Sequence, residues 1–357
     1  MSAPAPSMYS PAAAAMAGRL GLKLGKANLD TFSETLLTLA RADRNLVVVT
    51  SDSRGSGKLK PFADALPQQI VEVGIAEQNL VGVAAGLASA GKRVFAVSPA
   101  CFLTARSFEQ IKNDVAYSDH PVTLVGISAG VSYGALGTTH HSLHDFAALR
   151  AINNITIVSP ADNYETRQAV LSAAAASHPV YLRFGKAPVY DLLHPAGRAF
   201  GFGRALPLRE GRDLAFLATG ETVIHALLAA AELEARDGIQ CRVLSLPTVK
   251  PLDLPAVIAA ARDCGAVITV EEHMIHGGLG DACASAILEA GVAPRFRHLG
   301  IPDEYTVTGS QADIFRHYGL TMEGLARSAR ELLAKNKGAG IPFGAAAGEP
   351  LNSPTAS

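Results

Sequence analysis

Short runs of β-branched and other apolar residues alternate with longer segments of helical period along most of the chain. In the first half these runs predict strands at 46–50, 69–73, 93–97, 122–127, 155–158 and 180–183. The segments between them predict helices at 31–42, 77–90, 102–117, 143–150 and 163–176. This alternation is typical of a parallel sheet covered by helices, and right-handed crossovers then predict a doubly wound α/β fold.

The pattern breaks at about residues 186–212, where Pro, Gly and mixed charges replace any sustained period. Alternation then resumes, with strands predicted at 214–218, 241–246, 266–270 and 295–299 and helices near 221–236, 253–263 and 279–290. We therefore predict a first α/β domain, a linker and a smaller α/β domain, at 26–190, 191–211 and 212–337. The ends are rich in Ala, Pro and Ser, which predicts a flexible leader at 1–25 and a flexible tail at 338–357.

Composition narrows the class of partner. The length of 357 residues favours two domains, and 31 Lys and Arg against 32 Asp and Glu leave almost no net charge, which argues against nucleic acid or an anionic membrane as partner. The four cysteines are scattered without a CxxC pair, which fits a reducing, cytoplasmic setting better than a zinc knuckle or a disulfide framework. No secretory signal or membrane-spanning run is expected. We therefore expect a cytoplasmic protein that acts on small molecules.

In open α/β sheets, ligand chemistry gathers in the loops after the strands, and Glu77 lies in such a stretch, four residues after the strand predicted at 69–73 and at the start of the next helix. One interpretation is a first-turn acid that faces the positive end of the helix dipole. The next helix, however, shows no polar stripe, so it is expected to be buried on most sides. Burial and the helix terminus act in opposite directions on the ionisation of the acid. A bound nitrogen base that accepts a hydrogen bond from it would create a proton-transfer site.

The segment VEVGIAEQNLVGVAAGLA (71–88) resembles the thiamine-diphosphate motif of the transketolase superfamily. The resemblance continues in order through SPACFLTARSF, YGALGTTHHSLHDFAALR, SPADNYETRQAV, PVYLRFGK and TVEEHMIHGGLGDACASAI, and spans about residues 28–335. It implies a pyrimidine-binding domain followed by the carboxy-terminal domain of that superfamily. It also implies that Glu77 hydrogen-bonds N1′ of the aminopyrimidine of thiamine diphosphate, while the coenzyme performs the difficult chemical step.

The resemblance assigns further residues to the coenzyme. Phe102 is expected to stack on the pyrimidine ring, Phe108 to line the same pocket, and Gln78 to belong to the coenzyme site beside Glu77. Packing in the core is the alternative for either phenylalanine. The superfamily usually has another aromatic residue between the two, where this chain has Ala105, so a wider or differently closed pocket is expected.

Four residues are assigned to the substrate in the same way. His140 matches a sugar-contacting histidine and is expected to polarise a donor hydroxyl or exchange a proton with it, with His141 as a second candidate. Arg183 and Ser56 match residues that contact the substrate phosphate, and a planar guanidinium suits such an anion. His140 and His144 have a spacing that would permit a metal site on a helix. No HExxH or other convincing ligand set accompanies them, so no metal ligand is expected in this chain.

Two positions depart from the pattern of the superfamily. Leu136 stands where the superfamily has an aspartate that holds a donor hydroxyl, and Ser128 stands in the place of a phosphate-binding histidine. We therefore expect a donor or acceptor that differs from an ordinary pentose or hexose phosphate.

The sequence contains no Gly-Asp-Gly, the motif on which this superfamily holds the magnesium of the coenzyme diphosphate. We therefore expect one subunit of a split transketolase, in which an amino-terminal partner holds Mg²⁺ and two copies of each chain assemble. The expected reaction moves a two-carbon ketol unit from a ketose phosphate to an aldose, and only with the partner present. Alternatives are a subunit related to 1-deoxy-D-xylulose-5-phosphate synthase or to the β subunit of 2-oxoacid dehydrogenases, a non-catalytic scaffold subunit, and a metal-dependent hydrolase.

Overall fold

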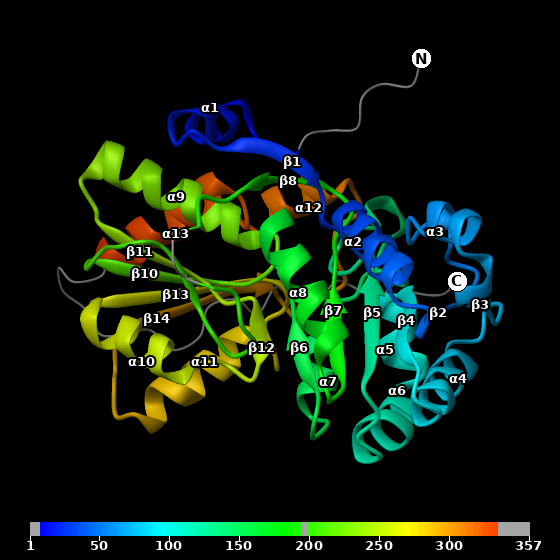
Figure 1. Cartoon of the computed structure of the whole chain (residues 1–357). Coiled ribbons are helices and arrows are strands. Elements are labelled where there is room, and N and C mark those ends of the chain that lie inside the picture. The colour runs from blue at the N-terminus through cyan, green and yellow to red at the C-terminus, as the bar shows by residue number, and fades with distance from the viewer. Residues whose placement is uncertain (1–7, 195–198, 335–357) are drawn as a thin grey trace, which may run out of the picture.

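The computed structural model describes residues 8–194 and 199–334, which form two helix-covered sheets (Figure 1). The first sheet is parallel except for one antiparallel edge strand. Its strands, in spatial order, are β12 (Thr248–Lys250), β6 (Thr156–Val158), β7 (Val180–Arg183), β5 (Val122–Ile127), β4 (Arg93–Pro99), β2 (Leu46–Thr50) and β3 (Ile70–Glu72). Every residue of β2, β5 and β7 is buried, which explains their continuous apolar sequence.

Helices cover both faces of this sheet. One face carries α2 (Asn28–Ala42), α3 (Lys60–Ala65) and α8 (Asn163–Ala175). The other face carries α4 (Glu77–Ser89), α5 (Ala100–Arg106), α7 (Asp145–Arg150) and a π-helix, η2 (Ile111–Tyr117). Short helical turns lie at α6 (Phe108–Gln110), η1 (Pro67–Gln69) and η3 (Gly134–Leu136). Because the two faces are both covered, the prediction of a doubly wound α/β layer is confirmed.

The helix predicted at 102–117 is broken in the structure. α5 ends at Arg106, and the chain continues through Ser107 (φ −104°, ψ 24°) into α6 and the π-helix. The hydroxyl of Ser107 donates to the carbonyl oxygen of Leu103, a contact that competes with regular helix bonding and often bends a helix.

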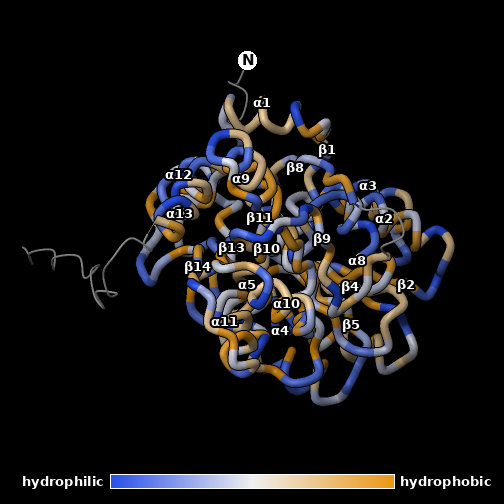
Figure 2. The backbone as a smooth tube through the Cα atoms, turned by 90° about the vertical axis from the view of Figure 1, so that its left-hand side faces the viewer, coloured by the Kyte–Doolittle hydropathy of each residue, from blue (hydrophilic) through white to orange (hydrophobic). Residues whose placement is uncertain are grey.

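The second sheet is also parallel except for one edge strand. In spatial order its strands are β14 (Arg295–Ile301), β13 (Ala266–Met274), β10 (Leu214–Ala218), β11 (Cys241–Ser245) and β9 (Leu206–Arg209). One face packs on α9 (Thr222–Asp237), α12 (Gln311–His317) and α13 (Met322–Ala334), the other on α10 (Leu254–Asp263) and α11 (Leu279–Glu289). β9 lies within the predicted linker but belongs to this sheet, as the antiparallel neighbour of β11. Figure 2 shows the hydrophobic stretches gathered in the interior and the hydrophilic ones in the outer turns.

The prediction of a flexible leader at 1–25 is wrong for the described part of that segment. Residues Pro11–Arg19 form α1, whose first turn is capped by the Ser10 hydroxyl at 3.0 Å from the amide of Ala13. Ala-rich sequence favours a helix, and the buried Met16 side chain anchors α1 to the core of the second domain. β1 (Lys23–Ala27) then pairs antiparallel with β8 (Pro188–Asp191). Residues 1–7 and the predicted tail lie outside the described residues.

The two domains exchange elements. β12 comes from the second domain in sequence but pairs with β6 of the first sheet, while α1 comes from the amino terminus and packs on the second domain.

No helix in the described part of the chain combines the length and the apolar character that a bilayer crossing requires.

Candidate active site

Glu77 is the first residue of α4, at the carboxyl edge of the first sheet. The chain turns from β3 into this helix through Gly74, whose φ of +73° suits a residue without a side chain. The Glu77 side chain is only 4% exposed. Its carboxylate accepts two hydrogen bonds from Nη1 of Arg106, at 3.0 and 2.9 Å. The acid therefore lies in a nearly dry site with one visible counterion.

Arg106 and Phe102 belong to the same turn of α5 and bring Glu77 next to a cavity. The guanidinium carbon of Arg106 lies 4.4 Å from the centroid of the Phe102 ring. Both side chains line a cavity of about 720 Å³. The rest of its wall comes from Cys101, Ala105, Thr138, Thr139, His141, Leu143, His144, Met274, Asp303, Glu304, Tyr305 and Thr306. The cavity is thus built from both domains, and Ala105 stands on its wall.

His140 lies in a row of aromatic rings beside this cavity. Its ring meets Phe102 on one side and Tyr133 on the other, edge to face, with 5.4 Å between centroids in both cases. Its Nδ1 atom is 2.9 Å from the hydroxyl of Thr139. The ring is half-buried, so it combines a fixed orientation with access to solvent. The structure therefore brings Phe102 and His140 together beside one cavity.

His141 is held by the protein at both ring nitrogens. Its Nε2 atom donates to the carbonyl oxygen of Gly134 at 2.9 Å, and Nδ1 accepts from the Thr306 hydroxyl at 2.9 Å. Burial lowers the pKa of His141 below its ordinary value, despite the hydrogen bond to Gly134. A neutral ring with both nitrogens engaged is not free to exchange a proton with a substrate. The geometry therefore opposes the substrate role expected for His141 and makes it a link between the two domains.

Arg183 does not reach the cavity. It is 5% exposed, its Nε atom donates to Asp145 at 2.8 Å, and its Nη2 atom donates to the carbonyl oxygens of Ser142 and Glu272 at 3.2 and 2.7 Å. Its guanidinium carbon also lies 4.6 Å from the centroid of the Phe146 ring. Because buried protein groups take up this guanidinium, the expected phosphate contact of Arg183 is corrected to a structural role.

Three other predicted residues lie apart from the cavity. Phe108 lines a different cavity of about 550 Å³ together with Tyr117, whereas Phe102 lines the cavity of about 720 Å³, so the shared coenzyme pocket stays a prediction. Gln78 is exposed on α4. Ser56 is half-buried in the loop after β2, where its hydroxyl donates to the backbone carbonyl of Ser53 at 3.3 Å.

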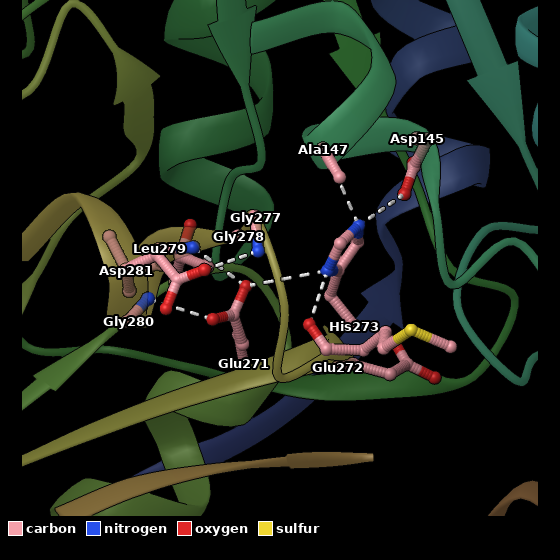
Figure 3. A network of polar contacts seen from close by, with 12 residues as sticks. Asp145, Ala147, Glu271, Glu272, His273, Gly277, Gly278, Leu279, Gly280 and Asp281 are labelled. Atoms are coloured by element: carbon pink, nitrogen blue, oxygen red, sulfur yellow. Dashed lines mark hydrogen bonds and ion pairs between the residues drawn. The ribbon is translucent and has the colours of Figure 1, made fainter. Parts of the chain in front are cut away.

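A buried polar network joins the second domain to α7 of the first domain, where Nε2 of His273 lies 3.4 Å from the amide of Ala147 and 3.9 Å from the carboxylate of Asp145 (Figure 3). The Glu271 carboxylate accepts hydrogen bonds from the amides of Leu279 and Gly280, both at 2.8 Å. The next residues of β13 face the first domain. Glu272 accepts from the amide of Val131 at 2.9 Å, and the His273 ring stacks on Phe146 with 5.0 Å between centroids. The second domain therefore helps to set the position of the histidine loop.

Glu221, at the start of α9, is expected to make the free energy of unfolding depend on pH. Burial raises the pKa of Glu221 from its ordinary value of 4.5 to about 8, and the nearby Glu272 adds to the rise while Arg183 opposes it. Between these two values the folded chain holds a proton that the unfolded chain has lost. The free energy of unfolding should therefore fall as pH rises from about 4.5 to about 8, and this contribution should stop changing above that range.

Glu221→Gln should remove this part of the slope, because an amide does not titrate. Urea unfolding of the wild type and the variant across this pH range measures it. An identical slope in both proteins would show that Glu221 is ionised normally in the folded state.

Sequence reasoning missed Arg106 and Thr306. Arg106 follows Phe102 by four residues, a spacing that places two side chains on one face of a helix, so helical periodicity contained a signal for it. Thr306 reaches His141 from the other domain, 165 residues along the chain, and no local pattern indicates that contact.

Comparison with known proteins places these features in a family. Residues 26–190 match the family model described as transketolase, pyrimidine binding domain, and residues 203–325 match the model described as transketolase, C-terminal domain. Over 305 residues the chain is 48% identical to one of the subunits of the apulose-4-phosphate transketolase of Phocaeicola vulgatus, and the match covers 85% of this chain and 97% of that relative. It is also 34% identical to 1-deoxy-D-xylulose-5-phosphate synthase of Syntrophotalea carbinolica, over 86% of this chain but 48% of the synthase.

A solved structure is similar over the whole described architecture. It is a split-gene transketolase described as an inactive β4 tetramer, with a TM-score of 0.77 and 35% sequence identity, and the match covers 87% of this chain and 99% of that chain.

Proposed function

Because the chain belongs to the transketolase family, we propose that it is the component of a split, thiamine-diphosphate-dependent transketolase that binds the aminopyrimidine end of the coenzyme. Its complex would transfer a two-carbon ketol unit from a ketose phosphate to an aldose acceptor. The observation that carries the proposal is Glu77: a buried carboxylate at the start of an apolar helix, next to an aromatic ring and a cavity.

These groups fit an aminopyrimidine. A buried carboxylate can hydrogen-bond a ring nitrogen, and the face of Phe102 can stack on a planar heterocycle. When bound, thiamine diphosphate supplies the carbon nucleophile of the reaction. The part of this chain is to hold the ring, to hold or move a proton at N1′ through Glu77, and to exchange a proton with a donor hydroxyl through His140. The Glu77 side chain is 4% exposed, and a site with little water strengthens these interactions.

Mg²⁺ and the coenzyme diphosphate are assigned to a partner chain. The sequence has no Gly-Asp-Gly, and a relative 48% identical to this chain is named as one subunit of a transketolase rather than as a whole enzyme. A cluster of Asp162, Glu165 and His194 brings three potential ligand atoms within 4.8 Å. Its contacts are those of a helix cap, however, since Asp162 accepts from the Glu165 amide at the start of α8 and from His194, both at 2.8 Å. We therefore assign no metal to this cluster.

We further propose a cytoplasmic complex with two copies of each chain. The four cysteines are buried and free, which suits a reducing compartment. The similar solved chain described as an inactive β4 tetramer supports both self-association and the need for a second kind of chain. Leu136, which is 56% exposed, stands in place of one carboxylate that would otherwise help to select the donor and acceptor sugars.

Reconstitution tests the proposal. The purified chain alone should show no ketol transfer. The chain combined with its amino-terminal partner, Mg²⁺ and thiamine diphosphate should transfer a ketol unit from one or more ketose phosphates. Chromatography of the sugar products measures the transfer. Robust transfer by the chain alone would contradict the split-enzyme assignment. Condensation of pyruvate with glyceraldehyde 3-phosphate, without ketol transfer, would instead establish the synthase alternative.

A further inference from the structure

Arg106 holds both groups that a coenzyme ring would need. Its Nη1 atom donates to the two carboxylate oxygens of Glu77 at 3.0 and 2.9 Å, and its guanidinium lies 4.4 Å above the ring of Phe102. An aminopyrimidine bound between Glu77 and Phe102 would use the same carboxylate and the same aromatic face. A ring stacked on this face of Phe102 would take the space that the guanidinium already occupies, next to the carboxylate that it pairs with.

The guanidinium and the aminopyrimidine are alike in the properties that matter here. Both are planar, both meet the carboxyl group of Glu77 through a nitrogen atom, and both stack on an aromatic ring. We infer that Arg106 is an internal occupant of the coenzyme-ring site, which the aminopyrimidine must displace from Glu77 and Phe102. This inference rests on the proposed function.

The surroundings of Arg106 suit exchange rather than permanent attachment. Its side chain is 50% exposed, against 4% for Glu77, and within the described residues Glu77 is its only hydrogen-bond partner. A half-exposed ion pair is weak and sensitive to salt. While the coenzyme is absent, Arg106 is the charged partner of the buried Glu77 carboxylate. A buried carboxylate without such a partner would lower the stability of the folded chain.

The cavity wall also carries other carboxylates that could pair with the displaced guanidinium. Asp303 and Glu304 stand on the wall of the same cavity as Arg106. Glu304 accepts a hydrogen bond from the Tyr318 hydroxyl at 2.9 Å, and its carboxylate can accept more. Rotation of the long Arg106 side chain from Glu77 toward these carboxylates would exchange one acidic partner for another, so the guanidinium would keep an anionic partner.

The test is a coenzyme titration of the reconstituted complex by calorimetry, at fixed Mg²⁺ and at low and high sodium chloride. Arg106→Met keeps the stem over Phe102 and removes the charge, so the half-saturating coenzyme concentration should fall about two- to fivefold, and its dependence on salt should shrink. Arg106→Gln, which also lacks the charge, should shift the titration in the same direction and guards against a packing defect in the first variant. Arg93→Met is the matched control, because Arg93 pairs with Asp43 at the surface and lines no part of this cavity.

Unchanged or weaker coenzyme binding in both charge-free variants, with normal binding by the wild type, would overturn the inference and leave the proposed function intact. A structure of the complex with bound thiamine diphosphate is a second test, and it needs no variant. In that structure Arg106 should no longer pair with Glu77. A guanidinium that still pairs with both carboxylate oxygens beside the bound ring would overturn the inference. If the wild-type complex binds no thiamine diphosphate at all, the proposed function itself fails.

Discussion

Glu77→Gln should reduce ketol transfer by the reconstituted complex about 10²- to 10⁴-fold, the range typical for loss of a group that moves a proton. The amide has the size of the carboxyl group and can still hydrogen-bond a ring nitrogen, but it can neither give up nor take a proton there. The loss should therefore appear in kcat at saturating coenzyme. Initial rates of ketol transfer, measured together with a separate coenzyme titration, distinguish impaired chemistry from impaired binding.

Glu109→Gln is the matched control, since Glu109 is an exposed acid on the neighbouring turn α6. It should leave kcat unchanged. Full activity of the Glu77→Gln complex would mean that the chain serves as a scaffold and that catalysis takes place elsewhere. A variant that loses coenzyme affinity but keeps its kcat would make Glu77 a binding group without a part in proton transfer.

Arg183→Met should lower the free energy of unfolding of the chain by about 3 to 5 kcal/mol, the cost of removing one partner from a buried ion pair. Asp145 and Glu272 would both remain in the junction between the domains without their cation. Burial is the largest influence on the pKa of Asp145 and acts to raise it, but the charges of Arg183 and His273 and the hydrogen bonds from Arg183 and Tyr181 together keep that pKa below its ordinary value. Urea unfolding at neutral pH, followed by circular dichroism, measures the change.

Arg167→Met provides the comparison, because Arg167 is an exposed arginine on α8 and its replacement should change the unfolding free energy by no more than about 0.5 kcal/mol. The double variant Asp145→Asn, Arg183→Met should recover part of the lost stability by removing one of the stranded charges. A small stability loss combined with a large rise in KM for a phosphorylated donor would restore the phosphate role that the resemblance implied for Arg183.

The central strands were predictable because each is buried on both faces and therefore consists of consecutive apolar residues. The segments 46–50, 122–127 and 180–183 coincide with β2, β5 and β7, since a strand covered on both faces needs apolar side chains at every position. The short strands β1, β8, β9 and β12 escaped prediction. Each is three to five residues long and is stabilised by hydrogen bonds to a strand distant in the chain, so its own sequence carries little signal.

Composition misled where tertiary packing decided the outcome. An Ala- and Pro-rich start suggested a flexible leader, yet Ala13, Met16 and Ala17 are buried against the second domain and α1 forms there. Similarly, the break at Ser107 depends on a local hydrogen bond that the helical period of 102–117 does not reveal. In both places the local pattern was compatible with two structures. Contacts with the second domain selected the helix at Pro11–Arg19, whereas at Ser107 a hydrogen bond within the segment accompanies the break.

For the candidate site, the amino-acid order alone placed an acid, Glu77, between a predicted strand and an apolar helix, and it placed Phe102 and His140 after strands that end at the same edge of the sheet. Those placements follow from apolar periodicity and from the geometry of parallel strands. Which groups surround them was decided only by folding: Arg106 on Glu77, Thr306 on His141, and Asp145 and Glu272 around Arg183. The availability of a charged side chain depends on how deeply it is buried and on its nearest partner, and both are properties of residues brought together in space.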